Sequence, residues 1–318
     1  MAVSKCIGVC GAGQMGAAAA VCFKRAGYRV WVWNHRAERL AALRRTVEGL
    51  ESWMDRHIGP AASGDGAIEP TPDLDVVDRQ ADLVLDCIVE DIEQKIDLFR
   101  RLAGCRDRGA IFTTTTSGLS ITEIGRRSGC GPLLAGAHFW NPPHLMPLVE
   151  VIRGEDTADR VVDEVCRIVE SIGKTPVRVN RDVPGFVGNR LLHALWREAI
   201  DLVEKGIASP ADIDRVARLT FGLRLPAVGP LENMDLVGLD LIKTIHDYLL
   251  ASLADNHGPA PCLVDHVAQG RLGIKSGQGF YDWSARSANE LIERRNRQIV
   301  HQLRFLEQLD HPSHDDGE

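Results

Sequence analysis

CIGVCGAGQMG, residues 6–16, joins a short apolar run to three glycines spaced as GxGxxG. The apolar run has the composition of a buried strand, and the alanine-rich segment Ala17–Arg25 after the glycines has that of a helix. In such a strand–loop–helix unit the glycines permit a tight turn and let the backbone approach a pyrophosphate at the positive helix N-terminus. The stretch therefore predicts a dinucleotide-binding site. Its expected cofactor-binding residues are Gly11, Gly13, Gln14, Met15 and Gly16.

A second strand is predicted at Tyr28–Trp33, and it ends at Asn34. A NAD-binding fold of this kind usually carries an acidic residue here, which binds the ribose 2′-hydroxyl. Asn34 removes that negative charge, and His35, Arg36 and Arg39 place positive charge beside it, a pattern that accommodates a 2′-phosphate. We therefore expect NAD or NADP as the cofactor, with NADP slightly favoured and Asn34 and Arg36 at the ribose. The alternative is that Asn34 still bonds the ribose while Arg36 is solvated.

The following residues continue the alternation of strands and helices. Ala81–Val89 is a nearly continuous apolar run, as in parallel strands that are buried on both faces, and Glu90 directly after it is expected at the cofactor. The other predicted elements are helices at Glu38–Arg56 and Ile92–Ala103, a loose connection at Gly59–Asp75, and strands at Ala110–Phe112 and near Leu133, Leu148 and Val177. Together they predict an α/β Rossmann-type N-terminal domain with a parallel-rich sheet.

A histidine and a glutamate stand in two apolar runs that a proline-rich turn separates. The run Leu133–Ala137 leads into His138, and Asn141-Pro142-Pro143 cannot continue that strand. Glu150 lies in the second run, Leu145–Ile152, where an unpaired buried carboxylate would be costly. We therefore expect Glu150 to hold His138 in one tautomer, so that the other ring nitrogen faces a substrate. The alternative is a buried structural histidine and an edge-strand glutamate.

A polar run, Thr113–Ser117, follows the strand predicted at Ala110–Phe112. Open α/β sheets bind ligands just beyond the carboxyl ends of their strands. Beside a nicotinamide, these hydroxyl groups are candidates to hydrogen-bond the reacting oxygen. The alternative is that the threonines only end a β-branched strand.

The sequence changes character at Asp182–Gly185, and almost all of the chain beyond it has helical periodicity. The predicted domains are a dinucleotide-binding domain at 1–183, an all-α substrate or dimerisation domain at 184–286, and a C-terminal amphipathic helix with a polar tail at 287–318. Predicted elements are helices at Phe186–Lys205, Pro210–Leu219 with Ser209 as N-cap, Leu236–Leu253 and Ala288–Leu309, and a glycine-studded loop with buried aromatic rings at Gly270–Trp283.

Composition excludes several classes of protein. A net charge of −7 gives no support for nucleic acid or an anionic membrane as a partner. The eight cysteines have no CxxC pairing, which indicates a reducing compartment, and no metal site is expected. No signal-peptide pattern and no run of about 18 apolar residues occurs, so we expect a cytoplasmic globular protein that acts on a small-molecule substrate.

Six segments taken in order resemble the 3-hydroxyacyl-CoA dehydrogenase family over residues 5 to about 284. The segments are GAGQMG (11–16), IFTTTTSGLSIT (111–122), GAHFWNPPHLMPLVEV (136–151), DVPGFVGNRLL (182–192), VGLD (237–240) and GIKSGQGFYDW (273–283). The resemblance implies reversible hydride transfer between a nicotinamide and a β-hydroxy or β-keto substrate, and a homodimer made by the helical domain. It also implies roles for four residues. His138 would be the general acid/base, Glu150 its orienting partner, and Ser117 and Asn189 the groups that hold the reacting oxygen, the histidine or the substrate.

The sequence departs from the family pattern at positions that bear on the substrate. Thr115 stands where the family usually has asparagine, and Gly118 replaces a serine. Residues 37–75, where CoA-using members carry a longer and lysine-rich helical hairpin, contain no lysine. TTSG, HFWNPPH and RLPAVGPLENMD resemble a branch that acts on free carboxylates or ring alcohols, including a pyridine carboxylate dehydrogenase of vitamin B6 breakdown. We therefore expect a small substrate without CoA.

Three alternatives remain open. The first is a 3-hydroxyacyl-CoA dehydrogenase, such as a 3-hydroxybutyryl-CoA dehydrogenase. The second is a catalytically silent, crystallin-like protein that binds a dinucleotide without turnover. The third, the NADP-linked β-hydroxyacid dehydrogenase and imine reductase group, ranks lower because it lacks HFWNPP and SGQGFYDW.

Overall fold

The computed structural model describes residues 6–61, 64 and 66–310, so the tail at 311–318 lies outside the described residues. The chain divides into two compact units, Met1–Arg190 and Leu191–Glu318, which we call unit 1 and unit 2. The three-part division at 183/184 and 286/287 stays a prediction.

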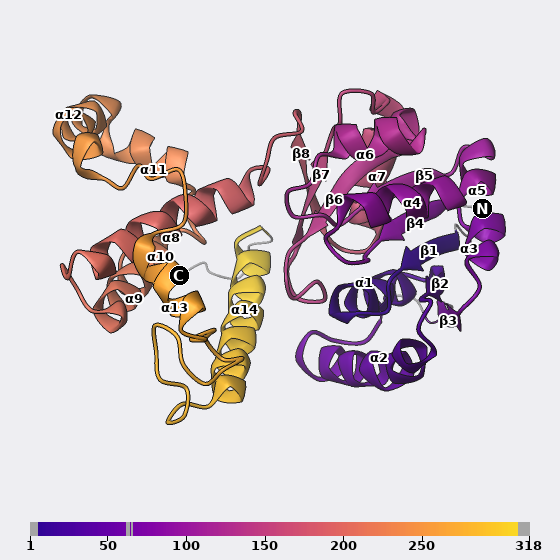
Figure 1. Cartoon of the computed structure of the whole chain (residues 1–318), viewed down its shortest axis with the longest axis horizontal. Coiled ribbons are helices and arrows are strands. Elements are labelled where there is room, and N and C mark those ends of the chain that lie inside the picture. Colours follow the sequence, from indigo (N-terminus) through magenta and orange to yellow (C-terminus); the bar gives the residue numbers. More distant parts are fainter. Residues whose placement is uncertain (1–5, 62–63, 65, 311–318) are drawn as a thin grey trace, which may run out of the picture. The chain divides into compact units, whose positions relative to one another are not determined.

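Unit 1 is built on one mixed sheet with helices on both faces (Figure 1). Its strands are β1 (Cys6–Cys10), β2 (Arg29–Trp33), β3 (Ala67–Thr71), β4 (Leu83–Asp86), β5 (Ile111–Thr114), β6 (Leu134–Phe139), β7 (Leu148–Ile152) and β8 (Thr175–Val179). Its helices are α1 (Gln14–Arg25), α2 (Ala37–His57), α3 (Leu74–Gln80), α4 (Ile92–Arg101), α5 (Ala103–Asp107), α6 (Ile121–Ser128) and α7 (Asp159–Ser171), with a 3-10 turn, η1, at Gly131–Leu133. The predicted Rossmann-type architecture is confirmed.

The order of the strands in the sheet is β3-β2-β1-β4-β5-β6-β7-β8, and all neighbours are parallel except β6 and β7. The chain leaves β1 toward β2 and β3 and then returns to β4 on the other side of β1. Ligands bind in open α/β sheets at this switch point, beyond the carboxyl ends of the strands. The topology therefore places the GxGxxG loop at the ligand-binding edge.

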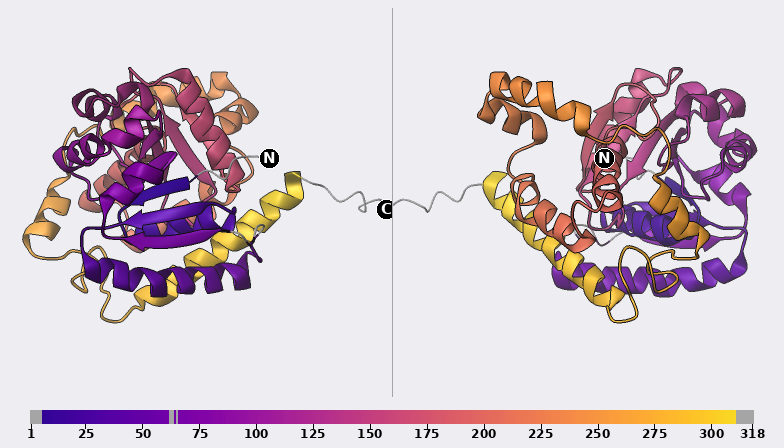
Figure 2. Two further views of the ribbon diagram at one scale, coloured as in Figure 1. Left: turned by 90° about the vertical axis from the view of Figure 1, so that its right-hand side faces the viewer. Right: turned by 60° about the vertical axis from the view of Figure 1, so that its left-hand side comes forward.

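Alternating side chains on each strand supply two hydrophobic cores. One core joins inward residues such as Val9 and Val32 to α1, α2 and α7. The other joins Cys10, Phe112 and Leu134 to α3, α4, α5 and α6. Figure 2 shows β1, β2 and β3 side by side, with α2 running along them. Because both faces are covered, the central strands are largely apolar, as the sequence predicts, and their buried polar residues, such as Asp86 and Thr114, stand at the carboxyl ends.

The loose connection predicted at Gly59–Asp75 is wrong in its second half, which contains β3 and the start of α3. The strand escaped prediction because AIEPT contains a proline and lacks an apolar run. Pro70 is tolerated because β3 is an edge strand that pairs with β2 alone, where Pro70 faces Val32. His138, which the sequence places where a strand ends, is the residue before the last of β6, so this prediction is confirmed.

Unit 2 is helical, which confirms the predicted class of the C-terminal half. Its elements are α8 (Gly188–Glu204, which begins in the last residues of unit 1), α9 (Pro210–Leu219), α10 (Phe221–Arg224), α11 (Pro230–Val237), α12 (Leu239–Leu249), the 3-10 turn η2 (Leu250–Ser252), α13 (Pro261–Ala268) and α14 (Ala288–Asp310). Ser209 caps α9 as predicted, since its side chain accepts a hydrogen bond from the amide of Asp212. The helix predicted at Leu236–Leu253 is confirmed as α12 for most of its length, but its predicted start is wrong. It breaks at Gly238, whose φ of 99° ends α11 and turns the chain into α12.

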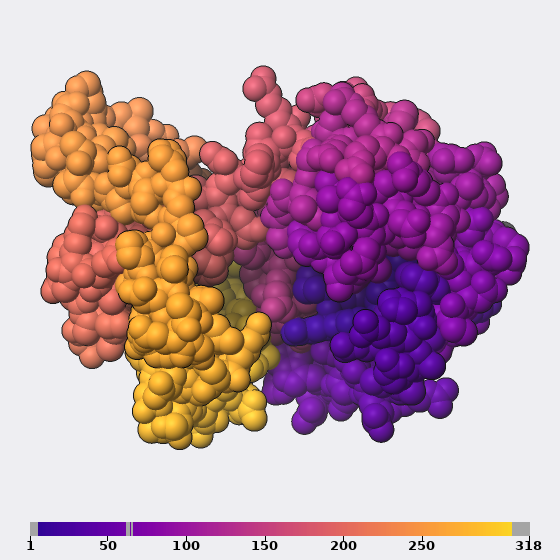
Figure 3. Space-filling view, in the orientation of Figure 1, coloured from indigo at the N-terminus to yellow at the C-terminus, as the bar shows by residue number. Residues whose placement is uncertain are grey.

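Unit 2 has no closed core within the single chain. None of the described residues between 191 and 306 is buried. Phe280, in the loop whose aromatic rings were expected to be buried, is 37% exposed, so that prediction is wrong. Figure 3 shows α11 and α12 standing out from the rest of this unit as a lobe. A helical unit that buries no side chain requires a further apolar surface to be stable.

Across the described residues, no helix combines the length and the apolar character needed to span a membrane.

Candidate active site

The three glycines of the phosphate loop have different physical roles. Gly11 has a φ of 125°, and a side chain there would collide with the carbonyl of Cys87. A side chain at Gly16 would collide with the carbonyl oxygen of Gly11, so this glycine lets α1 pack against the loop. Gly13 has no atom within 4 Å of the position its Cβ would occupy. This open space at the N-terminus of α1 fits a pyrophosphate.

The loop continues into a cavity of about 650 Å³, which the ends of β1, β2 and β4 border. Asn34 lines it, and its Oδ1 accepts a hydrogen bond from the amide of Arg36 at 2.9 Å. Arg36, Arg39 and Arg101 also line it. Arg101 lies over the ring of Trp33 and 3.9 Å from Asp97. Glu93 and Asp97 line it as well, so its excess of positive charge comes from the three arginines. The cavity has a size that suits the adenosine half of a dinucleotide, and Arg36 and Arg39 can meet negative charge there.

His138 and Glu150 are register partners across the antiparallel strands β6 and β7. Their side chains point to the same face of the sheet, where Nδ1 of His138 lies 2.8 Å from Oε2 of Glu150. Both residues are buried, with 5% and 2% of their surfaces exposed. Among the described residues Nδ1 is the hydrogen-bonded nitrogen of this ring, so Nε2 is the nitrogen that remains available to a substrate.

Glu150 is held as an anion by three donors. Burial alone raises the pKa of Glu150, but the hydrogen bond from His138 and those from the amides of Gly188 and Val187 outweigh it, so the pKa is lowered overall. Both amides donate to Oε1 at 3.0 Å. A buried carboxylate that accepts several hydrogen bonds stays ionised near neutral pH. Glu150 can therefore orient His138 and stabilise its protonated form.

Ser117 and Asn189 meet at the loop after β5. The side-chain amide of Asn189 donates to the carbonyl oxygen of Ser117 at 3.1 Å, while the amide of Ser117 donates to Oε1 of Glu90 at 2.8 Å. Since Gly188 bonds Glu150 and its neighbour Asn189 bonds Ser117, hydrogen bonds link the histidine dyad to this loop. The hydroxyl of Thr116 also donates to Glu90. Glu90 thus fixes the loop from the end of β4.

A buried ion pair between α4 and the end of β4 was not predicted from the sequence. Nζ of Lys95 lies 2.7 Å from Oδ2 of Asp86, and both residues are fully buried. The same carboxylate accepts from the hydroxyl of Thr114 at 2.7 Å, and Lys95 lies 3.7 Å from Glu90. A signal was present in the sequence. Lys95 falls on the apolar stripe of α4 with Ile92, Ile96 and Phe99, and Asp86 falls inside an apolar strand.

Two further predicted residues lie at the phosphate loop. The side-chain amide of Gln14 donates to Oδ1 of Asn141 at 3.4 Å, so the loop reaches the segment after β6. Asn141 was not among the predicted site residues. Met15 is partly buried and packs against the core that contains α1. Its predicted role at the cofactor stays a prediction.

Two family descriptions match most of the chain. Residues 6–183 match "3-hydroxyacyl-CoA dehydrogenase, NAD binding domain", and residues 185–283 match "3-hydroxyacyl-CoA dehydrogenase, C-terminal domain". The first match names NAD as the cofactor of this domain, which agrees with the open phosphate loop.

Individual relatives cover nearly the whole chain. A 5-formyl-3-hydroxy-2-methylpyridine 4-carboxylate 5-dehydrogenase of Mesorhizobium japonicum is 34% identical over 95% of this chain and 98% of its own. A probable 3-hydroxybutyryl-CoA dehydrogenase of Deinococcus radiodurans is 38% identical over 87% of this chain and 99% of its own.

Solved structures give the same two kinds of neighbour. A crystal structure of a 5-dehydrogenase for the pyridine carboxylate, described as an NAD⁺-dependent dismutase, has a TM-score of 0.90 at 33% identity and covers 96% of this chain and 99% of its own. That of (S)-3-hydroxybutyryl-CoA dehydrogenase from Ralstonia eutropha has a TM-score of 0.72 at 28% identity, covering 88% and 99%.

Proposed function

Because the chain belongs to the 3-hydroxyacyl-CoA dehydrogenase family, we propose that it is an NAD-linked dehydrogenase of a small hydroxyl or carbonyl compound without CoA. The observation that carries this proposal is the buried His138–Glu150 pair, in the same unit as a phosphate loop that is open at Gly13. A histidine whose second nitrogen is unused fits proton transfer to or from the reacting oxygen.

In the oxidative direction, Nε2 of His138 takes the hydroxyl proton of the substrate, and the negative Glu150 stabilises the imidazolium. NAD, held at its pyrophosphate by the loop around Gly13, would supply the hydride acceptor for this reaction and the hydride donor for its reverse. Ser117 and Asn189 position the reacting oxygen or the histidine. Glu90 and the buried Lys95 hold the loop that carries Ser117. In the reductive direction His138 donates the proton.

Two observations support a substrate without CoA. The relative named for a pyridine carboxylate aligns with 95% of this chain, against 87% for the Deinococcus 3-hydroxybutyryl-CoA dehydrogenase. The structure of a dehydrogenase for the pyridine carboxylate is also more similar in fold, with a TM-score of 0.90 against 0.72 for the Ralstonia enzyme. In addition, residues 37–75 hold α2 and β3 and contain no lysine for the phosphates of CoA. A free hydroxy acid or an aromatic ring alcohol or aldehyde with a carboxylate is the substrate class that fits.

One observation favours a 3-hydroxyacyl-CoA instead, since the Deinococcus relative has the higher identity, at 38%. The deciding measurement is kcat/KM for acetoacetyl-CoA against free β-keto acids, β-keto esters and pyridine carbaldehydes, each with NADH and NADPH. Turnover of the free compounds, with acetoacetyl-CoA at least about a hundredfold poorer, is expected. High kcat/KM for acetoacetyl-CoA would overturn the proposal, and absence of turnover with every substrate would favour the silent dinucleotide-binding protein.

We infer in addition that the ribose site tolerates the 2′-phosphate of NADP. Asn34 offers no negative charge to repel it, and Arg36, Arg39 and Arg101 line the same cavity. Charge-assisted hydrogen bonds from guanidinium groups suit a phosphate well. NADH that is better than NADPH by tenfold or more in kcat/KM would contradict this inference.

A homodimer through unit 2 is part of the same proposal. Unit 2 exposes large apolar side chains, with Leu231 at 74%, Leu236 at 76%, Leu239 at 59% and Tyr248 at 68%. Exposed apolar surface on this scale is typical of an interaction face. Light scattering should give twice the mass of the chain, and a monomer at micromolar concentration would contradict the proposal.

We place this activity in the cytoplasm. All eight cysteines are free thiols in the structure. Burial raises the pKa of the thiols of Cys10, Cys22 and Cys87, which keeps them protonated. Free thiols of this kind suit a reducing compartment. Fractionation of cells that produce the protein tests this placement.

A further inference from the structure

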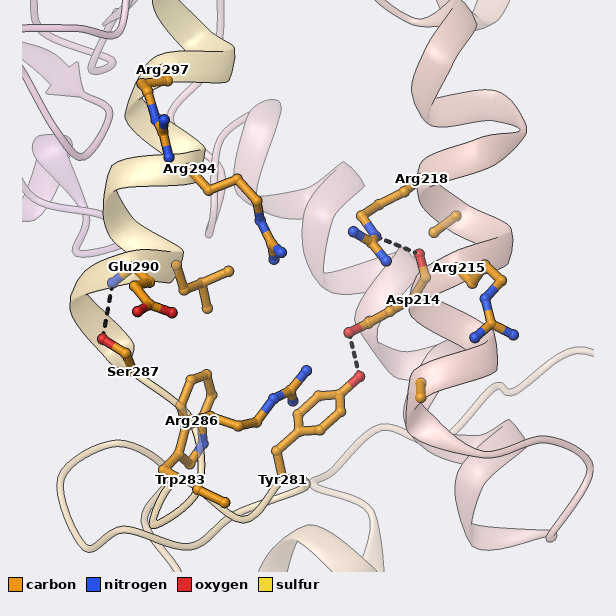
Figure 4. Close-up of a pocket in the computed structure, with 14 residues that line it drawn as sticks. Asp214, Arg215, Arg218, Tyr281, Trp283, Arg286, Ser287, Glu290, Arg294 and Arg297 are labelled. Atoms are coloured by element: carbon orange, nitrogen blue, oxygen red, sulfur yellow. Dashed lines mark hydrogen bonds between the residues drawn. The ribbon is translucent and has the colours of Figure 1, made fainter.

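Unit 2 contains a cavity of its own, lined by residues between 211 and 297, whereas the proposed catalytic residues lie between 117 and 189. Its volume is about 930 Å³, and it lies between α9, the segment Tyr281–Ser287 and the first turns of α14. Figure 4 shows Arg286 and Arg294 reaching into it from one side and Arg218 from the opposite side. Volumes of this size hold small organic ligands in other proteins.

The lining of this cavity is strongly positive. Five arginines line it, against two carboxylates, Asp214 and Glu290. Asp214 is already engaged, since its Oδ2 accepts a hydrogen bond from the hydroxyl of Tyr281 at 2.5 Å. Among the described residues, Arg286 and Arg294 have no carboxylate partner. Like charges gathered around a hollow repel one another and attract an anion, so this arrangement is typical of an anion-binding site.

Arg286 is held in place before any ligand arrives. Its guanidinium lies 4.2 Å from the ring centre of Tyr281 and 5.7 Å from that of Trp283. Stacking uses the flat face of a guanidinium and leaves the N–H groups at its edge free for carboxylate or phosphate oxygens. Tyr281 is fixed in turn to α9 by Asp214. Such positioning reduces the entropy that binding costs.

The shared activity of the family does not account for this cavity. The matched C-terminal domain ends at residue 283, so Arg286, Arg294 and Arg297 lie beyond it. We propose that the cavity binds a small organic polyanion, a phosphate ester or a polycarboxylate, with Arg286 and Arg294 from one side and Arg218 from the other. Bidentate contacts from arginine suit both kinds of oxyanion.

The test is calorimetric titration of the full chain with citrate and with inorganic pyrophosphate, at an ionic strength of about 50 mM. Three proteins are compared: wild type, Arg286→Gln/Arg294→Gln, and Arg295→Gln. Arg295 is the matched control, because it lies on α14 outside the cavity lining and bonds Asn296. Binding at the phosphate loop of unit 1 is common to all three proteins and is subtracted.

We expect wild type and Arg295→Gln to bind at least one probe with dissociation constants within about twofold of each other, and the double variant to bind it at least about tenfold more weakly. The better probe shows whether the site prefers phosphate or carboxylate. No binding to wild type beyond the phosphate loop, or equal weakening in Arg295→Gln, would overturn the proposal. If the double variant does not fold, Arg218→Gln on the facing helix α9 is compared with Arg295→Gln by the same criteria.

Discussion

His138 and Glu150 are bonded because they face each other in the register of β6 and β7, with Nδ1 and Oε2 2.8 Å apart. Opposite residues of an antiparallel pair have Cβ atoms roughly 4.5–5.5 Å apart, so the register alone brings these side chains within reach. A slip of one residue would send one of them to the other face of the sheet. The turn at Trp140–Pro147, which joins the two strands and sets this register, therefore holds the proposed catalytic pair together.

Replacing His138 by glutamine tests the proton transfer. We expect kcat to fall by roughly a hundredfold to ten-thousandfold, because a positioned acid/base contributes about that much. The affinity for NADH should remain, since His138 lies outside the cofactor cavity. Steady-state kinetics and fluorescence titration with NADH measure both quantities. Near wild-type turnover would remove His138 from the mechanism.

Glu150 should make the free energy of unfolding fall as the pH becomes acidic. Its pKa in the folded protein lies below the ordinary value of 4.5, so the ionised form stabilises the fold above that value. This contribution is lost as the pH falls through the folded pKa. Urea unfolding of wild type and Glu150→Gln should therefore give a free-energy difference that is constant from about pH 6 to 8 and shrinks below about pH 4. A difference that does not change with pH would contradict the assignment.

Asn34→Asp should move the preference toward NAD. Aspartate keeps an oxygen for the amide of Arg36, so the turn is preserved, while its charge repels a 2′-phosphate. We expect the ratio of kcat/KM for NADPH to that for NADH to fall by at least about tenfold, which corresponds to roughly 1.4 kcal/mol. An unchanged ratio would mean that Asn34 lies away from the ribose.

Gly13→Ala and Gly16→Ala separate cofactor binding from folding. The Cβ at Gly13 meets open space, so this variant should keep its melting temperature and lose affinity for NAD. At Gly16 the Cβ collides with the backbone of Gly11, so this variant should lose stability. Thermal unfolding and NADH titration of the two variants give the comparison. Equal melting temperatures would contradict the packing role of Gly16.

Lys95→Met should destabilise the protein by about 3–5 kcal/mol, because it leaves Asp86 charged, buried and without its cation. Lys95→Met/Asp86→Asn should recover much of this loss, since asparagine is neutral, its Oδ1 can still accept from the amide of Ile88, and its Nδ2 can donate to the hydroxyl oxygen of Thr114. Urea unfolding of both variants measures the effect. A double variant no more stable than Lys95→Met would mean that the charge of Asp86 is not the cause.

Elements with a strong local signal were predicted well from the sequence. The apolar run at β1 and the capped helix α9 carry their own signals, and both were found where expected. β3 was missed because it is an edge strand. Such a strand can form without a continuous apolar run and can contain a proline. The break at Gly238 was missed because a glycine within an apolar helical pattern can either continue the helix or end it. The sequence does not show that this glycine has a positive φ.

The predicted site was incomplete for a related reason. Glu150 could be paired with His138 because a buried carboxylate needs a partner and the histidine was the nearest suitable one. The amides of Val187 and Gly188 donate to the other carboxylate oxygen of Glu150. These hydrogen bonds could not be predicted from the sequence, because nearly every residue has a backbone amide. Lys95 was overlooked because a lysine on a helix is usually solvated.

By itself the sequence determined the α/β class, the phosphate loop, the likeness to a dehydrogenase family and the histidine–glutamate pair, because these follow from local periodicity, turn chemistry and residue type. The tertiary structure alone decided which buried charges meet, which amides face Glu150, and where arginines that are distant in sequence gather around one cavity. Those contacts join residues of different elements, and their energies depend on burial and distance, which are properties of the folded chain.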